Sequence, residues 1–212
     1  MTRTSTNNTT RLYNNNFLEI LSRCPFWLPL VVFIPVVFYF SFIGFTSLSE
    51  GLILEGILIA VGGVISWSLT EYLVHRFVFH YQPKSAFWKR FVYVVHGVHH
   101  DYPNDLNRLV FPVTVSIPLG FVVYYLFGLI PWTVEAYHWI FYSFYAVGYL
   151  CYDMIHFATH AVSNNNKLFT SIKRHHLNHH YQKSNTKYGV SSGLWDIVFN
   201  SLGSKKKGVQ DK

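Results

Sequence analysis

Charged residues and cysteines are scarce in this 212-residue chain. Asp, Glu, Lys and Arg together make up 13% of the residues, against roughly 25% in typical soluble domains. The two cysteines, Cys24 and Cys151, lie far apart, which argues against a disulfide framework. Apolar residues take the place of charge, since 50% of the chain is hydrophobic and 19% aromatic. This composition excludes a disordered protein and disfavours an ordinary soluble domain, while the length suits one domain.

The apolar residues fall in four long uncharged runs, which are Cys24–Ser49, Gly56–Thr70, Leu109–Val134 and Ala136–Tyr152. The first and third have 26 residues each, more than the ~20 that a membrane-spanning helix needs. The second reaches that length only by extending back across Glu55, and the fourth must continue past Asp153. We therefore predict an all-α integral membrane protein with four transmembrane helices in two hairpins, capped by a cytoplasmic helical domain. A soluble bundle of four buried helices is the less favoured alternative.

The positions of the basic residues predict the topology. All 17 lysines and arginines lie before the first run, between the second and third, or after the fourth. The positive-inside rule then places these segments and both termini in the cytoplasm. The membrane would be the endoplasmic reticulum in a eukaryote and the inner membrane in a bacterium. The net charge of +7 is explained by topology and anionic lipids, so no nucleic-acid partner is expected, although charge alone leaves a minor RNA role open.

The predicted domain organisation has three parts. Residues 1–23 are a disordered N-terminal tail and lead-in, because residues 1–16 are rich in Thr, Asn and Ser. Residues 24–202 form the membrane domain, and residues 203–212 form a basic C-terminal tail.

Eleven of the 12 histidines lie in four groups on the predicted cytoplasmic side, namely EYLVHRFVFH (His75, His80), HGVHH (His96, His99, His100), HFATH (His156, His160) and HHLNHH (His175, His176, His179, His180). Positions i, i+3 and i+4 share one helix face, so each H-x-x-H-H is expected to aim three imidazoles at one point. His75 and His80 are spaced i, i+5, and we expect the second span to end or bend between them. His138 stands alone and is expected to be an ordinary hydrogen-bonded residue.

Taking one H-x-x-H-H from HHLNHH leaves ten imidazoles in all; the sequence does not decide between His175 and His176. Ten exceed what one zinc ion binds, whereas two ions would take five each. Imidazole sites suit Fe, Zn, Cu or Ni, and five ligands on a six-coordinate ion leave one position for oxygen. Glu71 is four residues before His75, and Asp153 is three before His156. Each is expected in the second coordination shell, accepting the free ring N–H of a ligand.

From about Leu69 to Leu202 the chain resembles the fatty acid hydroxylase superfamily of membrane-bound, oxygen-dependent enzymes. The stretches DLNRLVFP and GVSSGLWDIVF resemble its fatty acid 2-hydroxylase branch. The resemblance implies Tyr152 and Asp153 as catalytic residues beside the metals, and ten metal ligands: His75, His80, His96, His99, His100, His156, His160, His176, His179 and His180. It also implies two metal ions, with iron expected for oxygen chemistry and zinc in preparations, and O2 as co-substrate. Many members carry a cytochrome b5 domain, for which the 23 residues before the first run are too few, so a separate electron donor such as cytochrome b5 or its reductase is expected.

The expected reaction is 2-hydroxylation of fatty acyl chains, in ceramide and other sphingolipids or in very-long-chain acids. Carbon 2 lies close to the lipid head, which suits a metal pair at the cytoplasmic interface. Candidates for binding the polar end of the substrate are Asp101, Asn104, Asp105, Arg108 and Tyr188, with membrane snorkelling as an equal explanation for Arg108. Two alternatives stay open. A sister enzyme would act on sterol, carotenoid or alkyl ether lipids, and a histidine-lined metal transporter is disfavoured because the mid-span residues are mostly Val, Ile, Phe and Leu.

Overall fold

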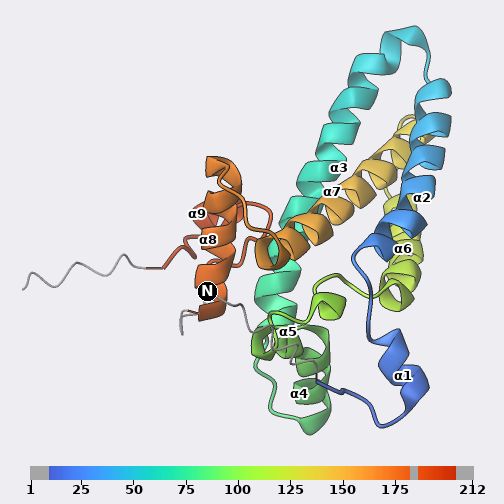
Figure 1. Cartoon of the computed structure of the whole chain (residues 1–212). Coiled ribbons are helices and arrows are strands. Elements are labelled where there is room, and N and C mark those ends of the chain that lie inside the picture. Colours follow the sequence, from blue (N-terminus) through green and yellow to red (C-terminus); the bar gives the residue numbers. More distant parts are fainter. Residues whose placement is uncertain (1–9, 182–185, 204–212) are drawn as a thin grey trace, which may run out of the picture.

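The computed structural model describes residues 10–181 and 186–203, and within these ranges every regular element is helical. Figure 1 shows a long bundle formed by α2, α3, α6 and α7, with α4 and α5 at one end of α3 and with α8 and α9 beside that end. The α-helices are α1 (Asn16–Leu21), α2 (Trp27–Thr46), α3 (Ile53–Val74), α4 (Ala86–Val92), α5 (Val98–Asp101), α6 (Val113–Gly128), α7 (Glu135–Ala161), α8 (Lys167–Tyr181) and α9 (Leu194–Val198). The prediction of an all-helical fold is confirmed for the described residues.

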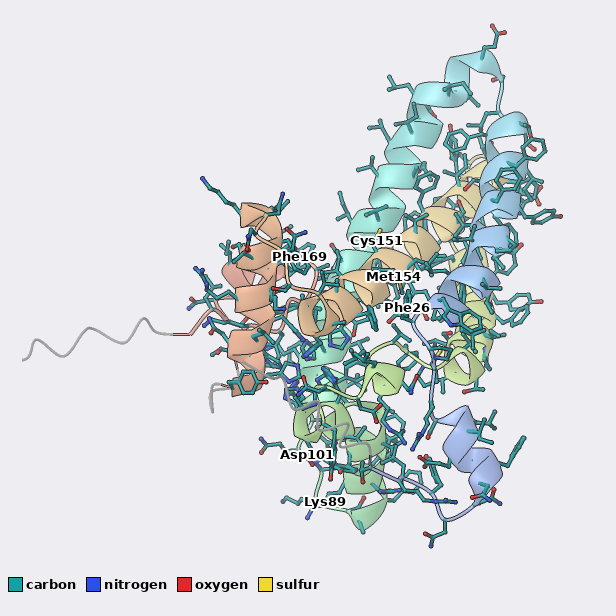
Figure 2. All side chains as sticks on the ribbon, viewed as in Figure 1. Phe26, Lys89, Asp101, Cys151, Met154 and Phe169 are labelled. Carbon is teal, nitrogen blue, oxygen red and sulfur yellow. The ribbon has the colours of Figure 1, made fainter. Side chains whose placement is uncertain are left out.

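Three helical segments are long and apolar enough to cross a membrane, namely Trp27–Thr46, Glu50–Phe79 and Leu106–Gly128. Only 17% of the residues in each apolar window are buried inside the protein. Their large side chains project outward, as Figure 2 shows for α2 and α3. Exposed apolar surface on this scale is stable in lipid and not in water, so the protein is an integral membrane protein.

Helix α7 is the centre of the bundle and packs against both α3 and α2. It is longer than the predicted fourth run and continues past Asp153 to Ala161, as that run required. Half of its residues are buried, including two tyrosines that make edge-to-face contacts with aromatic side chains of neighbouring helices. A Cβ atom on Gly63 of α3 would lie 2.6 Å from the Phe141 carbonyl oxygen and 3.0 Å from the Tyr145 nitrogen. Glycine at position 63 therefore allows the backbones of α3 and α7 to touch.

Two π-helical turns interrupt the regular helices where the histidines occur. Residues His75–Phe79 continue α3 as a π-helix, and Tyr93–Gly97 connect α4 to α5 in the same way. A π-helical turn carries i→i+5 hydrogen bonds, and the His80 N–H indeed donates to the His75 carbonyl at 3.2 Å. The predicted end or bend between these two histidines is therefore a widening of the helix, which brings an i, i+5 pair to one side.

The segment that follows Thr10, predicted to be part of a disordered tail, contacts the body of the protein. Leu12 is buried, and its N–H and that of Tyr13 donate to the Glu19 carboxylate at 2.9 and 3.1 Å. Burial alone would raise the pKa of Glu19, but these donors and the guanidinium groups of Arg23 and Arg108 outweigh it and lower the pKa below its ordinary value. Residues 1–9 and 204–212, where the rest of both predicted tails lies, are outside the described residues.

Candidate metal centre

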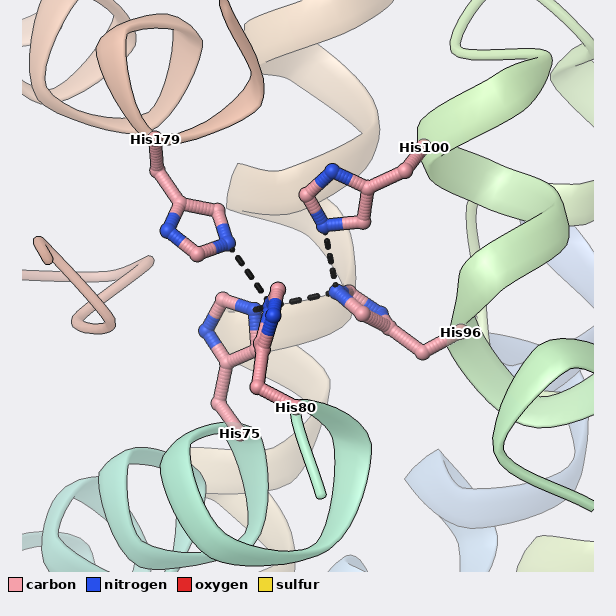
Figure 3. A group of neighbouring side chains, drawn as sticks. All are labelled: His75, His80, His96, His100 and His179. Atoms are coloured by element: carbon pink, nitrogen blue, oxygen red, sulfur yellow. Dashed lines mark hydrogen bonds between the residues drawn. The ribbon is translucent and has the colours of Figure 1, made fainter. Parts of the chain in front are cut away.

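Five imidazoles from three parts of the chain converge in a group that we call cluster A, drawn in Figure 3: His75, His80, His96, His100 and His179. Their ligand atoms all lie within 4.8 Å of one another. The Nε2 atom of His75 lies 3.0 Å from that of His96 and 3.2 Å from that of His80, and the Nε2 atoms of His80 and His179 are 2.9 Å apart. The rings thus present one nitrogen each to a common centre.

A second group, cluster B, has the same size and the same spacing of donors; it consists of His99, His156, His160, His176 and His180. The Nε2 atom of His99 lies 2.9 Å from that of His156 and 3.0 Å from that of His180, while His160 and His176 approach to 2.8 Å. The two clusters are adjacent, because the rings of His100 and His180 stack at a centroid distance of 4.2 Å. The structure thus divides the ten predicted imidazoles into two groups of five.

The expectation that each H-x-x-H-H motif serves one centre is wrong. In HGVHH, His96 and His100 belong to cluster A and His99 to cluster B. In α8, His176 and His180 belong to cluster B and His179 to cluster A. Residues i and i+4 lie almost one above the other on a helix, whereas the residue at i+3 is rotated to the opposite side of that row. Each motif therefore bridges the two clusters.

The tautomers of three imidazoles show that the clusters fit metal ions. The Nδ1 atoms of His75, His156 and His179 donate to the carbonyls of Tyr188, Leu109 and Thr186, respectively. A neutral imidazole has one N–H, so the Nε2 atom of each carries a lone pair directed into its cluster. On a six-coordinate ion with bonds of about 2.1 Å, ligands at 90° to one another lie about 3.0 Å apart, close to the spacings found here. The histidine clusters are therefore compatible with a metal centre.

Burial keeps these imidazoles in the state that binds metal. Loss of water, reinforced by the neighbouring imidazoles, holds the pKa of His96, His99 and His176 well below its ordinary value. The same causes lower the pKa of His100 to about 3. A metal ligand must be deprotonated, so these four rings need no proton loss at neutral pH before binding an ion.

The two remaining histidines of the chain have structural partners. His175, which the sequence left as an alternative to His176, points away from cluster B and bonds to Asp196 with a distance of 2.9 Å between Nε2 and Oδ2. His138 contacts the Tyr124 carbonyl at 3.0 Å through Nε2 and is buried between helices. His176 is thus the residue placed in a cluster, and His138 is the hydrogen-bonded residue that was predicted.

The structure gives Glu71 and Asp153 acceptor roles that differ from the predicted ones. Glu71 accepts the N–H groups of Val190 and Ser191 at 2.7 and 2.9 Å and the Ser191 hydroxyl. Asp153 accepts the Phe111 N–H at 3.2 Å. Each carboxylate thus bonds to a loop, and that loop, rather than the carboxylate, supplies the carbonyl that accepts from His75 or His156.

Two cavities adjoin the clusters. The larger, about 220 Å³, lies among α2, α3, α6 and α7, and it has a mostly apolar lining that includes Phe33, Gly120 and Tyr142. The smaller, about 50 Å³, is lined by His96 of cluster A and by His99 and His156 of cluster B. Phe79, Phe111 and Tyr152 line both cavities. An apolar pocket thus approaches the histidines through three shared aromatic residues.

The residues predicted to bind the polar end of a substrate lie in different surroundings. Tyr188 is buried with its ring against His75, His80 and His179. Tyr152, expected to be a catalytic residue, stacks on His156 at 5.8 Å. Asp101 and Asn104 are exposed at the end of α5 and in the loop that follows.

Arg108 forms ion pairs with Asp105 and with Glu19 of the N-terminal segment. Arg108 is buried and pairs with Glu19 at 2.7 Å and with Asp105 at 3.3 Å. It therefore does not snorkel toward water. It also lines the smaller cavity, together with Ser22.

Asp196 is a buried residue that the sequence argument did not single out, although it lies within the stretch GVSSGLWDIVF. It accepts the N–H groups of Tyr188 and Gly189, both at 2.8 Å, and the Ser201 hydroxyl at 2.7 Å. A fully buried carboxylate needs such partners. The signal available in the sequence was a lone Asp among the apolar residues of LWDIVF, which predicts a satisfied buried acid rather than a surface charge.

Fold and site together define a membrane-embedded helical protein with paired histidine clusters beside an apolar pocket. The family model of the fatty acid hydroxylases matches residues 60–201. This chain belongs to the fatty acid hydroxylase family, whose members are metal-dependent hydroxylases.

Individual relatives agree with this assignment. The chain is 37% identical to the dihydroceramide fatty acyl 2-hydroxylase FAH2 of Arabidopsis thaliana over 91% of this chain and 79% of that protein. It is 31% identical to the fatty acid 2-hydroxylase of Rattus norvegicus, with 91% of this chain and 56% of the rat protein covered. A solved structure described as full-length scs7p, with only the hydroxylase domain visible, matches with a TM-score of 0.81 at 32% identity, covering 92% of this chain and 73% of that one.

Proposed function

We propose that this protein is an oxygen-dependent fatty acyl 2-hydroxylase that uses a pair of histidine-bound metal ions. The observation that carries the proposal is that the small cavity, lined by histidines of both clusters, shares three lining residues with the large apolar cavity within the membrane helices. The relatives named as dihydroceramide or fatty acid 2-hydroxylases support the acyl chain of a sphingolipid as the substrate. A very-long-chain free acid is the second substrate that this site would admit.

The large cavity provides a place for the acyl chain. Apolar side chains line most of it, and an alkyl chain gains about 0.8 kcal/mol for each buried CH₂ group. Leu119 lines this cavity and is half-exposed on the outside of α6, so the cavity lies close to the lipid-facing surface. A lipid in the surrounding membrane would therefore enter sideways, with its polar head kept at the end where the histidines lie.

The chain's own residues would position carbon 2 and keep water away. Phe79 stacks on His96 at 5.0 Å, and Tyr152 stacks on His156. Together with Phe111 these rings line both cavities, so the first carbons of a chain lying in the large cavity would lie close to the histidines. Two bound metal ions, with iron expected as the native metal, would supply the activation of O2. In the net reaction one oxygen atom replaces a hydrogen on carbon 2 as a hydroxyl group, and the other leaves as water after uptake of two electrons and two protons.

The sequence and the helix arrangement support a four-span topology with both termini and the histidine clusters on the cytoplasmic side. Helix α7 has 27 residues, or about 40 Å at 1.5 Å per residue, enough to cross the ~30 Å hydrocarbon core. Cysteine labelling at Ser85 and Ser163 should report one side and labelling at Ser49 the other. Labelling of Ser163 on the same side as Ser49 would contradict a spanning α7.

The reaction also requires an electron donor, and we propose a separate redox protein of the cytochrome b5 type or its reductase. A eukaryotic host would place the enzyme in the endoplasmic reticulum and a bacterial host in the inner membrane. Residues 24–202 would form the catalytic domain, between residues 1–23 and the basic segment 203–212.

Lipid mass spectrometry of cells that lack their own 2-hydroxylase and express this chain tests the function. Ceramide acyl chains should gain one oxygen, and fragmentation should place it at carbon 2. The gain should require O2 and disappear in a His99→Ala variant present at the same level in the membrane. Oxidised sterol, carotenoid or alkyl ether lipid with unchanged acyl chains would contradict the proposal, as would metal uptake without any oxidised lipid.

A further inference from the structure

Residues 186–191, which we call the bracket, hold two imidazoles of cluster A through the protein backbone. The Thr186 carbonyl accepts from His179 Nδ1 at 2.8 Å, and the Tyr188 carbonyl accepts from His75 Nδ1. These two histidines lie on α8 and at the end of α3, so one short segment orients ligands from two separate helices. The bracket is therefore a natural determinant of the geometry of cluster A.

Two buried carboxylates fix the bracket from opposite sides. Glu71 on α3 accepts the N–H groups of Val190 and Ser191 and the Ser191 hydroxyl. Asp196 on α9 accepts the N–H groups of Tyr188 and Gly189. The exposed fraction is 5% for Glu71 and 0% for Asp196. These five hydrogen bonds to two buried carboxyl groups leave the bracket little freedom to shift.

In cluster B, fewer hydrogen bonds of this kind from the described residues orient the imidazoles. Asp153 accepts the Phe111 N–H, and the Leu109 carbonyl two residues earlier accepts from His156 Nδ1 at 2.7 Å. Within the part of the chain that the structure describes, the buried Nδ1 atoms of His99, His176 and His180 have no hydrogen-bond partner. One ring of cluster B is thus oriented by a carbonyl, while three others have a buried donor that the described residues do not satisfy.

These differences bear on metal affinity. A ligand histidine whose second nitrogen donates a hydrogen bond is held in one tautomer and orientation and becomes a stronger base. Loss of such a partner lowers metal affinity about 10–100-fold. We propose that Glu71 and Asp196 are positioning residues of cluster A, acting through the bracket, and that cluster A holds its metal ion more tightly than cluster B. This inference rests on the paired-metal site of the proposed function.

The first test follows the release of Zn²⁺ from the purified, fully loaded protein into excess EDTA, with the metal content of the protein measured by mass spectrometry. Two ions should leave in two phases, the second at least about tenfold more slowly. His179→Ala and His180→Ala form a matched pair, since these neighbours on α8 belong to different clusters. His179→Ala should remove the slow phase, and His180→Ala the fast phase. A single phase for both ions, or the reverse assignment, would overturn the inference.

The second test perturbs the support and leaves every imidazole in place. Glu71→Gln and Asp196→Asn should each accelerate the slow phase about 10–100-fold with no change in the fast phase, and Ser191→Ala should do so more weakly. Asp153→Asn should instead accelerate the fast phase. Glu55→Gln makes the same charge change on α3, where Glu55 bonds to Tyr137, and should alter neither phase. Equal acceleration of both phases by Glu71→Gln and by Asp196→Asn would overturn the inference.

A Co²⁺-loaded sample adds a spectroscopic measurement, because a general loss of stability would not change the visible absorption of one bound Co²⁺ ion alone. The visible absorption of one Co²⁺ ion should change in Glu71→Gln and that of the other in Asp153→Asn; changes in both ions with both variants would overturn the inference. Two-phase release in a protein that makes no 2-hydroxylated lipid would support the inference and contradict the proposed function. A protein that binds no pair of Zn²⁺ ions would overturn both.

Discussion

Clusters A and B each have five imidazole donors at nearly the same spacing, but they differ in the hydrogen bonds that orient these imidazoles. His75 in cluster A is oriented by a carbonyl 113 positions later in the chain, and His179 by the same segment. In cluster B, as far as the described residues go, such a carbonyl is present for His156 alone, from Leu109. Equal sets of donors therefore do not make equal sites, because the support of each donor is supplied by a different part of the fold.

The largest expected effect comes from removing a donor from either cluster. His99→Ala and His179→Ala should each lower 2-hydroxylated product at least about 100-fold, since loss of a direct ligand exceeds the 10–100-fold loss caused by an indirect partner. Product measured by lipid mass spectrometry, together with metal content, checks this. Near-normal product from either variant would show that the two clusters do not work as a pair.

A smaller effect, confined to cluster A, is expected from Gly189→Ala in the bracket. A Cβ atom at position 189 would lie 2.0 Å from the Ser192 carbonyl oxygen and 3.0 Å from Asp196 Oδ2. The bracket would have to shift, and metal affinity at cluster A should fall about 10–100-fold, as measured by chelator competition. Gly51→Ala is the control, because a Cβ atom there meets nothing within 4 Å. An unchanged affinity in Gly189→Ala would show that the conformation of the bracket does not determine the metal affinity of cluster A.

A change in substrate preference without a change in either cluster is expected from Gly120→Leu on α6. A Cβ atom at position 120 lies 3.4 Å from Tyr142 Oη and 3.6 Å from Phe33 Cε1, so a leucine would fill part of the large cavity. Product should shift several-fold toward shorter acyl chains, while the metal content stays at the wild-type value. An unaltered chain-length profile would place the acyl chain outside this cavity.

The smallest and least selective effect is that of pH on the metal-free protein. Because the pKa of His96, His99 and His176 is lowered in the folded state, only the unfolded chain takes up these protons below about pH 6.5. Stability is thus complete above that pH and is lost as the pH falls below it. The melting temperature in detergent should fall between pH 7.5 and 5.5. Loaded protein should show a smaller fall, since bound metal competes with protons.

The histidine pattern was sufficient to predict two groups of five imidazoles, because ten exceed what one ion binds, but it left His175 and His176 as alternatives. The pattern did not predict which histidine belongs to which cluster, and each H-x-x-H-H was wrongly expected to serve a single centre. The error has the same cause in both motifs, including the one on the regular helix α8: the i+3 residue is rotated away from the row formed by i and i+4, which is enough to direct it to the other cluster. The π-helical turn His75–Phe79 had a separate effect, because it brings His75 and His80 to one side despite their i, i+5 spacing.

Local chemistry, recorded in the sequence itself, determined the apolar helices, the choice of imidazole as donor and the family of the protein. Tertiary structure alone decided that Glu71 acts on Ser191, 120 positions away, and that Asp196 holds the segment orienting two ligands. Composition and periodicity report a residue's nearest neighbours along the chain. Hydrogen bonds between a helix and a distant loop depend instead on how the packed helices bring the two together, and this is what makes two clusters of identical composition unequal.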